Sequence, residues 1–282
     1  MSDFKKDLVS FPTPFLRALE NDKYNKYHSD FSVTQLLGPP QATFLATKTE
    51  RVESGYSSFM ALLGTAIHSV LESNVDESLG EMAEVRFYHT MLGKVVSGQA
   101  DFIENKTLFD YKNTGGAQDQ AKPEHRDQVQ MNGYLAVKNG IEITQVAVVY
   151  LQRDWSYLQS TLNPAYPQSP FRIFVFDYDE AYAENLFLTK IPEHVEALAG
   201  NPRPCTKEEK WEKPETYALM KPEGKRASKV CATMAEAEEN KKPGQFIQVR
   251  KGEATKCLFF CGYSQNCIQH QNDLDQNKQF EE

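Results

Sequence analysis

A predicted β-hairpin between residues 95 and 113, VVSGQADFIENKTLFDYKN, constrains the fold of this chain more than any other stretch. Its arms are residues 95–103 and 107–112, and both are rich in residues that favour strands. A tight turn at Asn105 and Lys106 joins the arms, because Asn tolerates a positive φ angle. A turn of this length fixes which residues of the two arms stand opposite each other.

This register brings charged side chains together. If Glu104 pairs with Thr107, then counting back places Asp101 opposite Asp110, and Gln99 opposite Lys112. Asp110 and Lys112 are two residues apart and share a face of the strand. Two facing carboxylates are stable only when one is protonated or a cation lies between them, and Mg²⁺ or Mn²⁺ suits oxygen ligands. A nearby lysine can hold an attacking water or stabilise charge on a phosphate. The alternative is a solvated strand face with an incidental ion pair.

Length and charge set the general bounds. A chain of 282 residues predicts one large domain, or one domain with a small appendage. No apolar run is long enough for a membrane helix and the N-terminus lacks an apolar signal segment, so we expect a cytoplasmic protein without membrane contact. The net charge of −8 argues against a protein that coats DNA, although local basic patches remain compatible with nucleic-acid chemistry. Positive residues gather after residue 200, where interspersed acidic residues favour a merely solvated surface.

The pattern of apolar residues predicts an α/β domain over residues 1–200, with a mixed sheet and helices around it. Short helical stretches flank Pro39-Pro40. The longer expected elements, in chain order, are a helix at 57–73, strands at 84–89, 95–103 and 107–112, a helix at 124–138, strands at 143–151 and 171–178, and a helix at 180–198. Residues 107–151 then form a right-handed βαβ unit, and residues 152–170 form a polar loop. Within the first long helix, Gly64 would permit another backbone to approach closely.

Residues 201–282 differ in character and form a C-terminal α+β segment that we expect to pack on the first domain. Short strands are expected at 216–220, 225–230 and 245–250. Thr233 and Glu236 form a capping box that opens a short helix, and a polar, frayed tail is expected from Gln269. All five cysteines follow residue 200, and three have the spacing Cys257-x₃-Cys261-x₅-Cys267. In a cytoplasmic chain, such clustering favours a metal site over disulfides.

Four short motifs in this order resemble the RecB-like branch of the PD-(D/E)xK nuclease superfamily. They are Gly64-x-x-x-His68, Gly98-x-x-Asp101, Asp110-x-Lys112 and Gln130-x-x-x-Tyr134. The resemblance covers roughly residues 30–178, and the size and cysteine-rich tail resemble phage-encoded exonucleases of this group. It implies a restriction-endonuclease-like core with a central mixed β-sheet flanked by helices, followed by the cysteine-containing C-terminal segment.

The resemblance also implies roles for individual residues. His68, Asp101, Asp110 and the backbone carbonyl of Tyr111 would ligate Mg²⁺ or Mn²⁺. Lys112 would position or activate the attacking water and stabilise the transition state. Glu84 would either support the metal ligands from outside or bind a second metal. The residues assigned to DNA contact, or to orienting the lysine, are Gln130 and Tyr134.

Some relatives in this branch hold a [4Fe–4S] cluster with one cysteine before the core and three after it. Here no cysteine precedes Cys205, so Cys205 would have to join Cys257, Cys261 and Cys267; the less favoured substitutes are Cys231 and His270. This set could bind an iron–sulfur cluster or Zn²⁺, and either site would be structural. The third alternative is that the cysteines hold no metal.

The leading functional prediction is a metal-dependent DNA exonuclease in phage recombination, replication or DNA degradation, located in the host cytoplasm. An exonuclease is preferred because no separate recognition domain is evident. The alternatives are a structure-specific endonuclease or nickase, an inactive nuclease-fold DNA-binding protein, and a metalloenzyme unrelated to nucleic acid. The expected partners are DNA and a single-strand annealing or binding protein, and the sequence does not indicate an oligomeric state.

Overall fold

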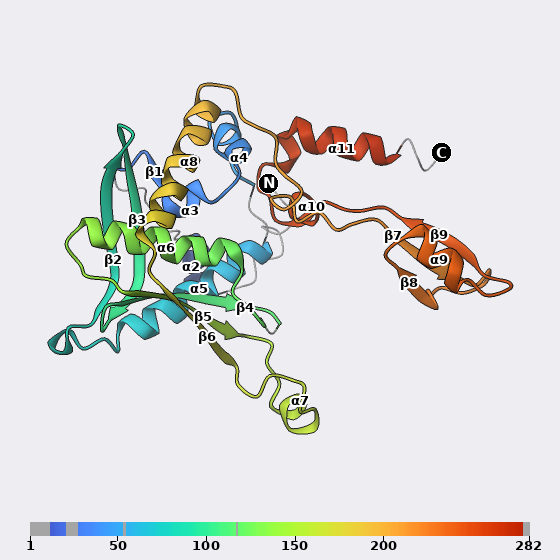
Figure 1. Cartoon of the computed structure of the whole chain (residues 1–282), viewed down its shortest axis with the longest axis horizontal. Coiled ribbons are helices and arrows are strands. Elements are labelled where there is room, and N and C mark those ends of the chain that lie inside the picture. Colours follow the sequence, from blue (N-terminus) through green and yellow to red (C-terminus); the bar gives the residue numbers. More distant parts are fainter. Residues whose placement is uncertain (1–11, 21–27, 53–54, 117, 279–282) are drawn as a thin grey trace. The chain divides into compact units, whose positions relative to one another are not determined.

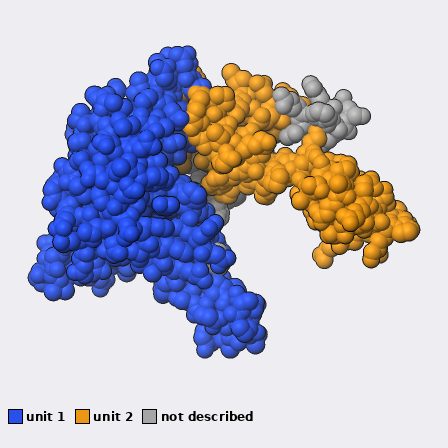
Figure 2. Space-filling model, in the orientation of Figure 1, with its two compact units in different colours: residues 1–43, 53–202 blue, residues 44–52, 203–282 orange. Residues whose placement is uncertain are grey.

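The computed structural model describes residues 12–20, 28–52, 55–116 and 118–278 (Figure 1). The chain divides into two compact units, shown in different colours in Figure 2. The first comprises residues 1–43 and 53–202, and the second comprises residues 44–52 and 203–282. No helix in the described ranges is long and apolar enough to cross a membrane.

A six-stranded mixed sheet forms the centre of the first unit. Its strands are β1 (Phe31–Ser32), β2 (Met82–Met91), β3 (Lys94–Glu104), β4 (Thr107–Thr114), β5 (Gln145–Gln152) and β6 (Phe171–Asp177). The order is β1-β3-β4-β5-β6, with β2 also paired to β3. The pairs β1–β3 and β4–β5 are parallel, and the other three are antiparallel. The predicted α/β class with a central mixed sheet is confirmed.

The sequence of β5 explains why this strand is buried. Strand β5, QVAVVYLQ, is nearly continuous in apolar residues, and Val146, Ala147 and Val148 are fully buried. Such a run suits a strand covered on both faces. Helix α6 (Pro123–Lys138) connects β4 to the parallel strand β5, as the predicted βαβ unit requires.

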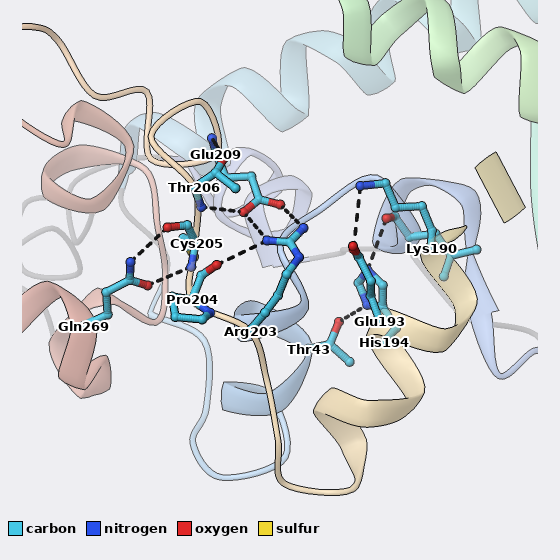
Figure 3. A network of polar contacts seen from close by, with 11 residues as sticks. Thr43, Lys190, Glu193, His194, Arg203, Pro204, Cys205, Thr206, Glu209 and Gln269 are labelled. Carbon is cyan, nitrogen blue, oxygen red and sulfur yellow. Dashed lines mark hydrogen bonds and ion pairs between the residues drawn. The ribbon is translucent and has the colours of Figure 1, made fainter. Parts of the chain in front are cut away.

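The remaining helices of this unit are mostly those predicted. They are α2 (Thr13–Glu20), α3 (Val33–Leu36), α5 (Gly55–Glu72), η2 (Glu77–Leu79), α7 (Tyr157–Leu162) and α8 (Glu180–Leu198). The side chain of Asp179 accepts a hydrogen bond from the backbone of Tyr182 and so caps α8. The short helix α4 (Pro40–Leu45) begins at the second proline of the Pro-Pro pair, and its Thr43 meets the buried His194 of α8 at 2.8 Å (Figure 3).

Two predictions for this unit are wrong. The segment at 152–170 is not all loop, because Ser156 caps the short helix α7 through a hydrogen bond from the backbone of Gln159. At Gly64, an added Cβ would meet no atom of the described residues within 4 Å, so the expected close approach of a backbone is not found.

One edge of β3 is shared between two neighbours. Strand β1 pairs with its beginning and β4 with its end, while residues 98–101 pair with neither. Helix α6 fills this interval, since the side chain of Asn132 donates a hydrogen bond to the carbonyl of Gln99 at 2.9 Å. An added Cβ at Gly98 would lie 2.3 Å from Oδ1 of Asn132, so only glycine permits this packing.

The second unit contains a small antiparallel sheet in the order β8-β7-β9. Its elements are β7 (Thr216–Met220), β8 (Lys229–Cys231), α9 (Met234–Asn240) and β9 (Phe246–Arg250). The predicted capping box is present, because Thr233 accepts from the backbone of Glu236 and Glu236 accepts from the backbone of Ala232. The strand expected from 225 begins only at Lys229.

Further along, the second unit has α10 (Thr255–Phe259), η3 (Ser264–Asn266) and α11 (Ile268–Lys278). The tail predicted to fray from Gln269 is therefore helical as far as residue 278. The side chain of Gln269 contributes to this order by bonding to the backbone of Cys205.

Candidate metal and nuclease site

The candidate site lies where β3 and β4 separate. Three residue pairs join these strands, and the last is Phe102 with Phe109. The next residues, Asp101 and Asp110, stand where the ladder stops. There the carboxylate of Asp101 accepts a hydrogen bond from the backbone N–H of Tyr111 at 2.7 Å. The predicted turn is thus correct, but the ladder ends before it reaches the acidic pair.

The end of the ladder changes one predicted neighbour. Gln99 does not face Lys112, because it pairs instead with Arg86 of β2. Its amide bridges Arg86 and Glu84, donating to the carboxylate of Glu84. Gln99 therefore lies beside Glu84, on the β2 side of β3.

His68, Glu84 and Asp101 offer ligand atoms within 4.8 Å of one another, and they are the only such trio of acidic, His or Cys residues in the described part of the chain. Nδ1 of His68 lies 2.9 Å from Oε1 of Glu84 and 3.6 Å from Oδ1 of Asp101. All three line an open pocket of about 270 Å³. The ligands of an octahedral Mg²⁺ lie about 3 Å apart, so this trio has the spacing and chemistry for one divalent cation.

Local structure positions each member of the trio. The ring of Tyr111 packs edge-on against the His68 ring, with centroids 6.0 Å apart. Glu84 has a φ angle of 53°, which is unfavourable for a residue with a side chain. The β2–β3 ladder skips this residue and Asp101 opposite it. The distortion turns Glu84 toward His68, so the backbone is strained where the candidate ligands meet.

A second cluster involves Asp110 and Lys112. Asp110 is 2% exposed, and its Oδ2 lies 2.8 Å from Nζ of Lys112. Gln128 of α6 binds both, donating to Asp110 at 2.9 Å and accepting from Lys112 at 3.0 Å. The lysine is thus held rigidly, with 22% of its side chain exposed. Gln128 was not among the residues predicted for the site.

Burial and charge shift the protonation of these groups. Burial raises the pKa of Asp101 to about 7, and the charge of Asp110 adds to the effect. Burial also raises the pKa of Asp110, against the influence of Lys112. The hydrogen bond to Glu84 raises the pKa of His68. A cation would offset the repulsion from Asp110 that adds to the effect of burial on the pKa of Asp101.

Gln130 and Tyr134 lie elsewhere. Gln130 is 1% exposed, and its amide donates to the carbonyl of Asp177 and accepts from the N–H of Asp179, both at 2.9 Å. Tyr134 is 2% exposed and donates to Glu184 at 3.2 Å. The lysine is oriented by Gln128 rather than by either residue. Their contact with DNA stays a prediction, and both have an interior packing role.

The predicted ligand set is therefore divided between two clusters. His68 and Asp101 come together with Glu84, while Asp110 pairs with Lys112. Tyr111 lies between the clusters, and its backbone N–H contacts Asp101. The role of its carbonyl as a ligand stays a prediction.

Four cysteines gather in the second unit. Burial raises the pKa of Cys205 to about 12, and the charges of Glu209, Cys267, Cys257 and Cys261 raise it further. Burial likewise raises the pKa of Cys257 to about 11, with Cys261 and Cys267 contributing. These mutual effects mean that the four thiols are neighbours. All four are free thiols.

Polar contacts hold Cys205 in this place. Gln269 of α11 donates to its carbonyl at 2.9 Å and accepts from its N–H at 2.8 Å (Figure 3). Next to it, Arg203 forms an ion pair with Glu209 at 2.7 Å. The fifth cysteine, Cys231, is instead buried in the small core of the β8-β7-β9 sheet with Leu219.

Comparisons with known proteins give distant matches only. No family model matches the sequence, and no curated protein matches it. The structure is similar to SSO0001 with 21% identity and a TM-score of 0.44, over 64% of this chain and 85% of that one. It is also similar to the Eubacterium rectale protein named "Putative exonuclease" (12% identity, TM-score 0.40, 71% of this chain and 91% of that one). LHK-Exo in complex with dAMP aligns with 13% identity and a TM-score of 0.30, over 60% and 91% of the two chains. Alignments at this level say nothing about activity, which must be inferred from the site itself.

Proposed function

We propose that this protein is a divalent-metal-dependent nuclease that hydrolyses phosphodiester bonds of DNA, acting as an exonuclease. The observation that carries the proposal is the junction of β3 and β4. There a cation-binding trio lies beside a buried aspartate–lysine pair. The motif resemblance supports DNA as the substrate and attack from an end.

The trio would hold Mg²⁺ or Mn²⁺. His68, Glu84 and Asp101 supply one nitrogen and two carboxylates at suitable spacing. Such an ion lowers the pKa of a bound water and polarises a phosphoryl oxygen. Gln99 fixes the carboxylate of Glu84, and the N–H of Tyr111 fixes that of Asp101. These contacts leave the ligands little freedom to rearrange.

Lys112 would stabilise the negative charge that develops on the phosphate. Asp110 and Gln128 hold its ammonium group from two sides, and part of the side chain remains exposed. A preorganised cation of this kind typically contributes about 100- to 1,000-fold to the rate.

The test is digestion of end-labelled linear DNA and closed circular DNA with Mg²⁺, Mn²⁺ or EDTA. We expect metal-dependent loss of linear DNA alone. Lys112→Ala should lose at least about 100-fold in rate. Lys106→Ala is the matched control, because this lysine lies in the same hairpin but is exposed and paired with Glu142; its rate should be unchanged.

Other outcomes identify the alternatives. Cutting of circles would indicate the endonuclease or nickase. DNA binding without hydrolysis under any metal would indicate an inactive nuclease fold. Equal activity of the Lys112→Ala and Lys106→Ala proteins would refute the assigned site. The predicted role in phage recombination and the predicted annealing or single-strand-binding partner stay predictions.

The cysteine cluster is proposed to hold an iron–sulfur cluster. A single tetrahedral Zn²⁺ places its sulfurs about 3.8 Å apart. In the described residues, no three cysteine sulfurs lie within 4.8 Å of one another, although the four thiols are neighbours. We prefer an iron–sulfur cluster because the resemblance implies one, and a single Zn²⁺ is the alternative. Iron, sulfide and zinc content of anaerobically purified protein tests this, with Cys231→Ser as a control that should retain the cluster.

A further inference from the structure

We propose that one end of the β8-β7-β9 sheet is a second DNA-binding surface, which contacts the phosphate backbone away from the hydrolytic residues. The choice of DNA as the polyanion rests on the proposed function. This basic tip comprises residues 221–229 and 241–245, the two loops at the same end of the sheet.

The topology brings these loops together. Met220, at the end of β7, pairs with Phe246, at the start of β9, and Leu219 pairs with Lys229, at the start of β8. The segments before β8 and before β9 therefore meet at one end. A hydrogen bond from Gln245 to the hydroxyl of Ser228, 2.6 Å long, joins them directly.

Both loops contain tight turns that hold cations in place. In residues 242–245, the backbone of Gln245 donates to the carbonyl of Lys242, and Gly244 has a φ angle of 81°, as a type II turn requires. In residues 221–224, the backbone of Gly224 donates to the carbonyl of Lys221. Each turn has a proline at its second position, which restricts it further.

The charge of the tip is strongly positive. It contains six basic residues and one carboxylate, Glu223, in a chain whose net charge is −8. Two of the cations are neutralised by α9, since Lys229 pairs with Glu236 and Lys241 with Glu238. The remaining four are exposed and take part in no ion pair among the described residues: Lys221, Lys225, Arg226 and Lys242.

The sequence predicts a solvated surface here because acidic residues are interspersed with basic ones. In the fold, the acids of α9 pair with two specific lysines, Lys229 and Lys241, and leave the other cations of the tip unopposed. Four unpaired cations on two joined loops match a row of phosphates in charge. The nearby ring of Phe246, 46% exposed, offers an apolar surface for a sugar or base.

The experiment is equilibrium binding of a short fluorescein-labelled duplex by the full chain in EDTA, over a range of salt concentrations. In the test variant, all four unpaired cations of the tip are replaced by Gln. At low salt it should bind at least about tenfold more weakly, and the slope of log affinity against log salt should fall by about 3 to 4. Because these side chains make no ion pairs, circular dichroism should show an unchanged fold.

A matched control removes the same charge elsewhere, from four lysines that are paired with carboxylates: Lys106, Lys138, Lys190 and Lys213, each replaced by Gln. Its affinity and salt slope should stay close to those of the wild type. Equal losses in both variants would mean that only net charge matters and would overturn the proposal, as would wild-type affinity in the tip variant or no DNA binding by the wild type.

The same measurement separates this proposal from the proposed hydrolysis. If the protein binds DNA through the tip but degrades none, the DNA-binding surface is supported and the proposed hydrolysis is refuted. If the protein degrades DNA and the tip variant binds DNA as the wild type does, the hydrolysis is supported and the DNA-binding surface is refuted.

Discussion

Replacing Gln130 by Ala should destabilise the fold without touching the chemistry. Its amide donates to the carbonyl of Asp177 and accepts from the N–H of Asp179, and the side chain is 1% exposed. Truncation removes both hydrogen bonds, each of which contributes about 0.5–1.5 kcal/mol. The backbone groups of the exposed residues Asp177 and Asp179 can then bind water instead. The free energy of unfolding should therefore fall by roughly 1–3 kcal/mol.

The measurement is urea unfolding followed by far-UV circular dichroism, with Gln128→Ala as the matched control. Gln128 lies on the same helix, but its partners Asp110 and Lys112 still pair with each other when it is removed. Gln130→Glu keeps an acceptor for Asp179 but buries a carboxylate that faces the carbonyl of Asp177, so it should lose at least as much stability as Gln130→Ala. A Gln130→Ala protein within about 0.5 kcal/mol of the wild type, but weakened in DNA affinity, would refute the interior role.

Three further predictions concern the site and the core. Gln128→Ala should lower the hydrolysis rate by about tenfold or more, because Lys112 loses one of its two contacts, and should leave Mn²⁺ affinity unchanged in calorimetry. Burial and the charge of Lys112 lower the pKa of His125 to about 3. Below about pH 6.5, His125 therefore binds a proton in the unfolded chain but not in the folded protein. The free energy of unfolding should fall by as much as about 2 kcal/mol from pH 7 to pH 5 for this reason. Denaturant titrations of His125→Gln should show that this part of the pH dependence is gone. Gly98→Ala should lower the unfolding free energy by about 1–3 kcal/mol through overpacking. Gly64→Ala should raise it by up to about 1 kcal/mol in the same assay, because an added Cβ there meets no neighbouring atom of the described residues within 4 Å.

Periodicity alone predicted most of the elements, because burial on one or both faces leaves a clear pattern in the sequence. The continuous apolar run of β5 and the capping residue Asp179 are examples. The extent of strand pairing left no such pattern. The β3–β4 ladder ends early because β1 and Asn132 of α6 occupy the same edge of β3, and both contacts are long-range. That is why the pairing of Gln99 was predicted incorrectly.

The site residues also differ in whether the sequence could predict them. His68, Asp101, Asp110 and Lys112 were chosen from short motifs. Gln128 carries no motif, yet the βαβ geometry could have identified it. A helix that returns between parallel strands begins beside the end of the first strand, so the early residues of α6 lie beside Lys112. Tyr134, six residues later, is about 9 Å further along the helix.

The early end of the β3–β4 ladder has a mechanical consequence. Strands β1, β2 and β3 form one half of the sheet, and β4, β5 and β6 form the other. Three residue pairs of the β3–β4 ladder join the halves, and α6 packs against both. Asp101 and Asp110 lie on the two sides of this short ladder, and the hydrogen bond from the N–H of Tyr111 to Asp101 links the strands beyond it. A cation held by His68, Glu84 and Asp101 would fix the carboxylate of Asp101. The amide of Tyr111, which donates to that carboxylate, would then exchange its hydrogen with solvent more slowly.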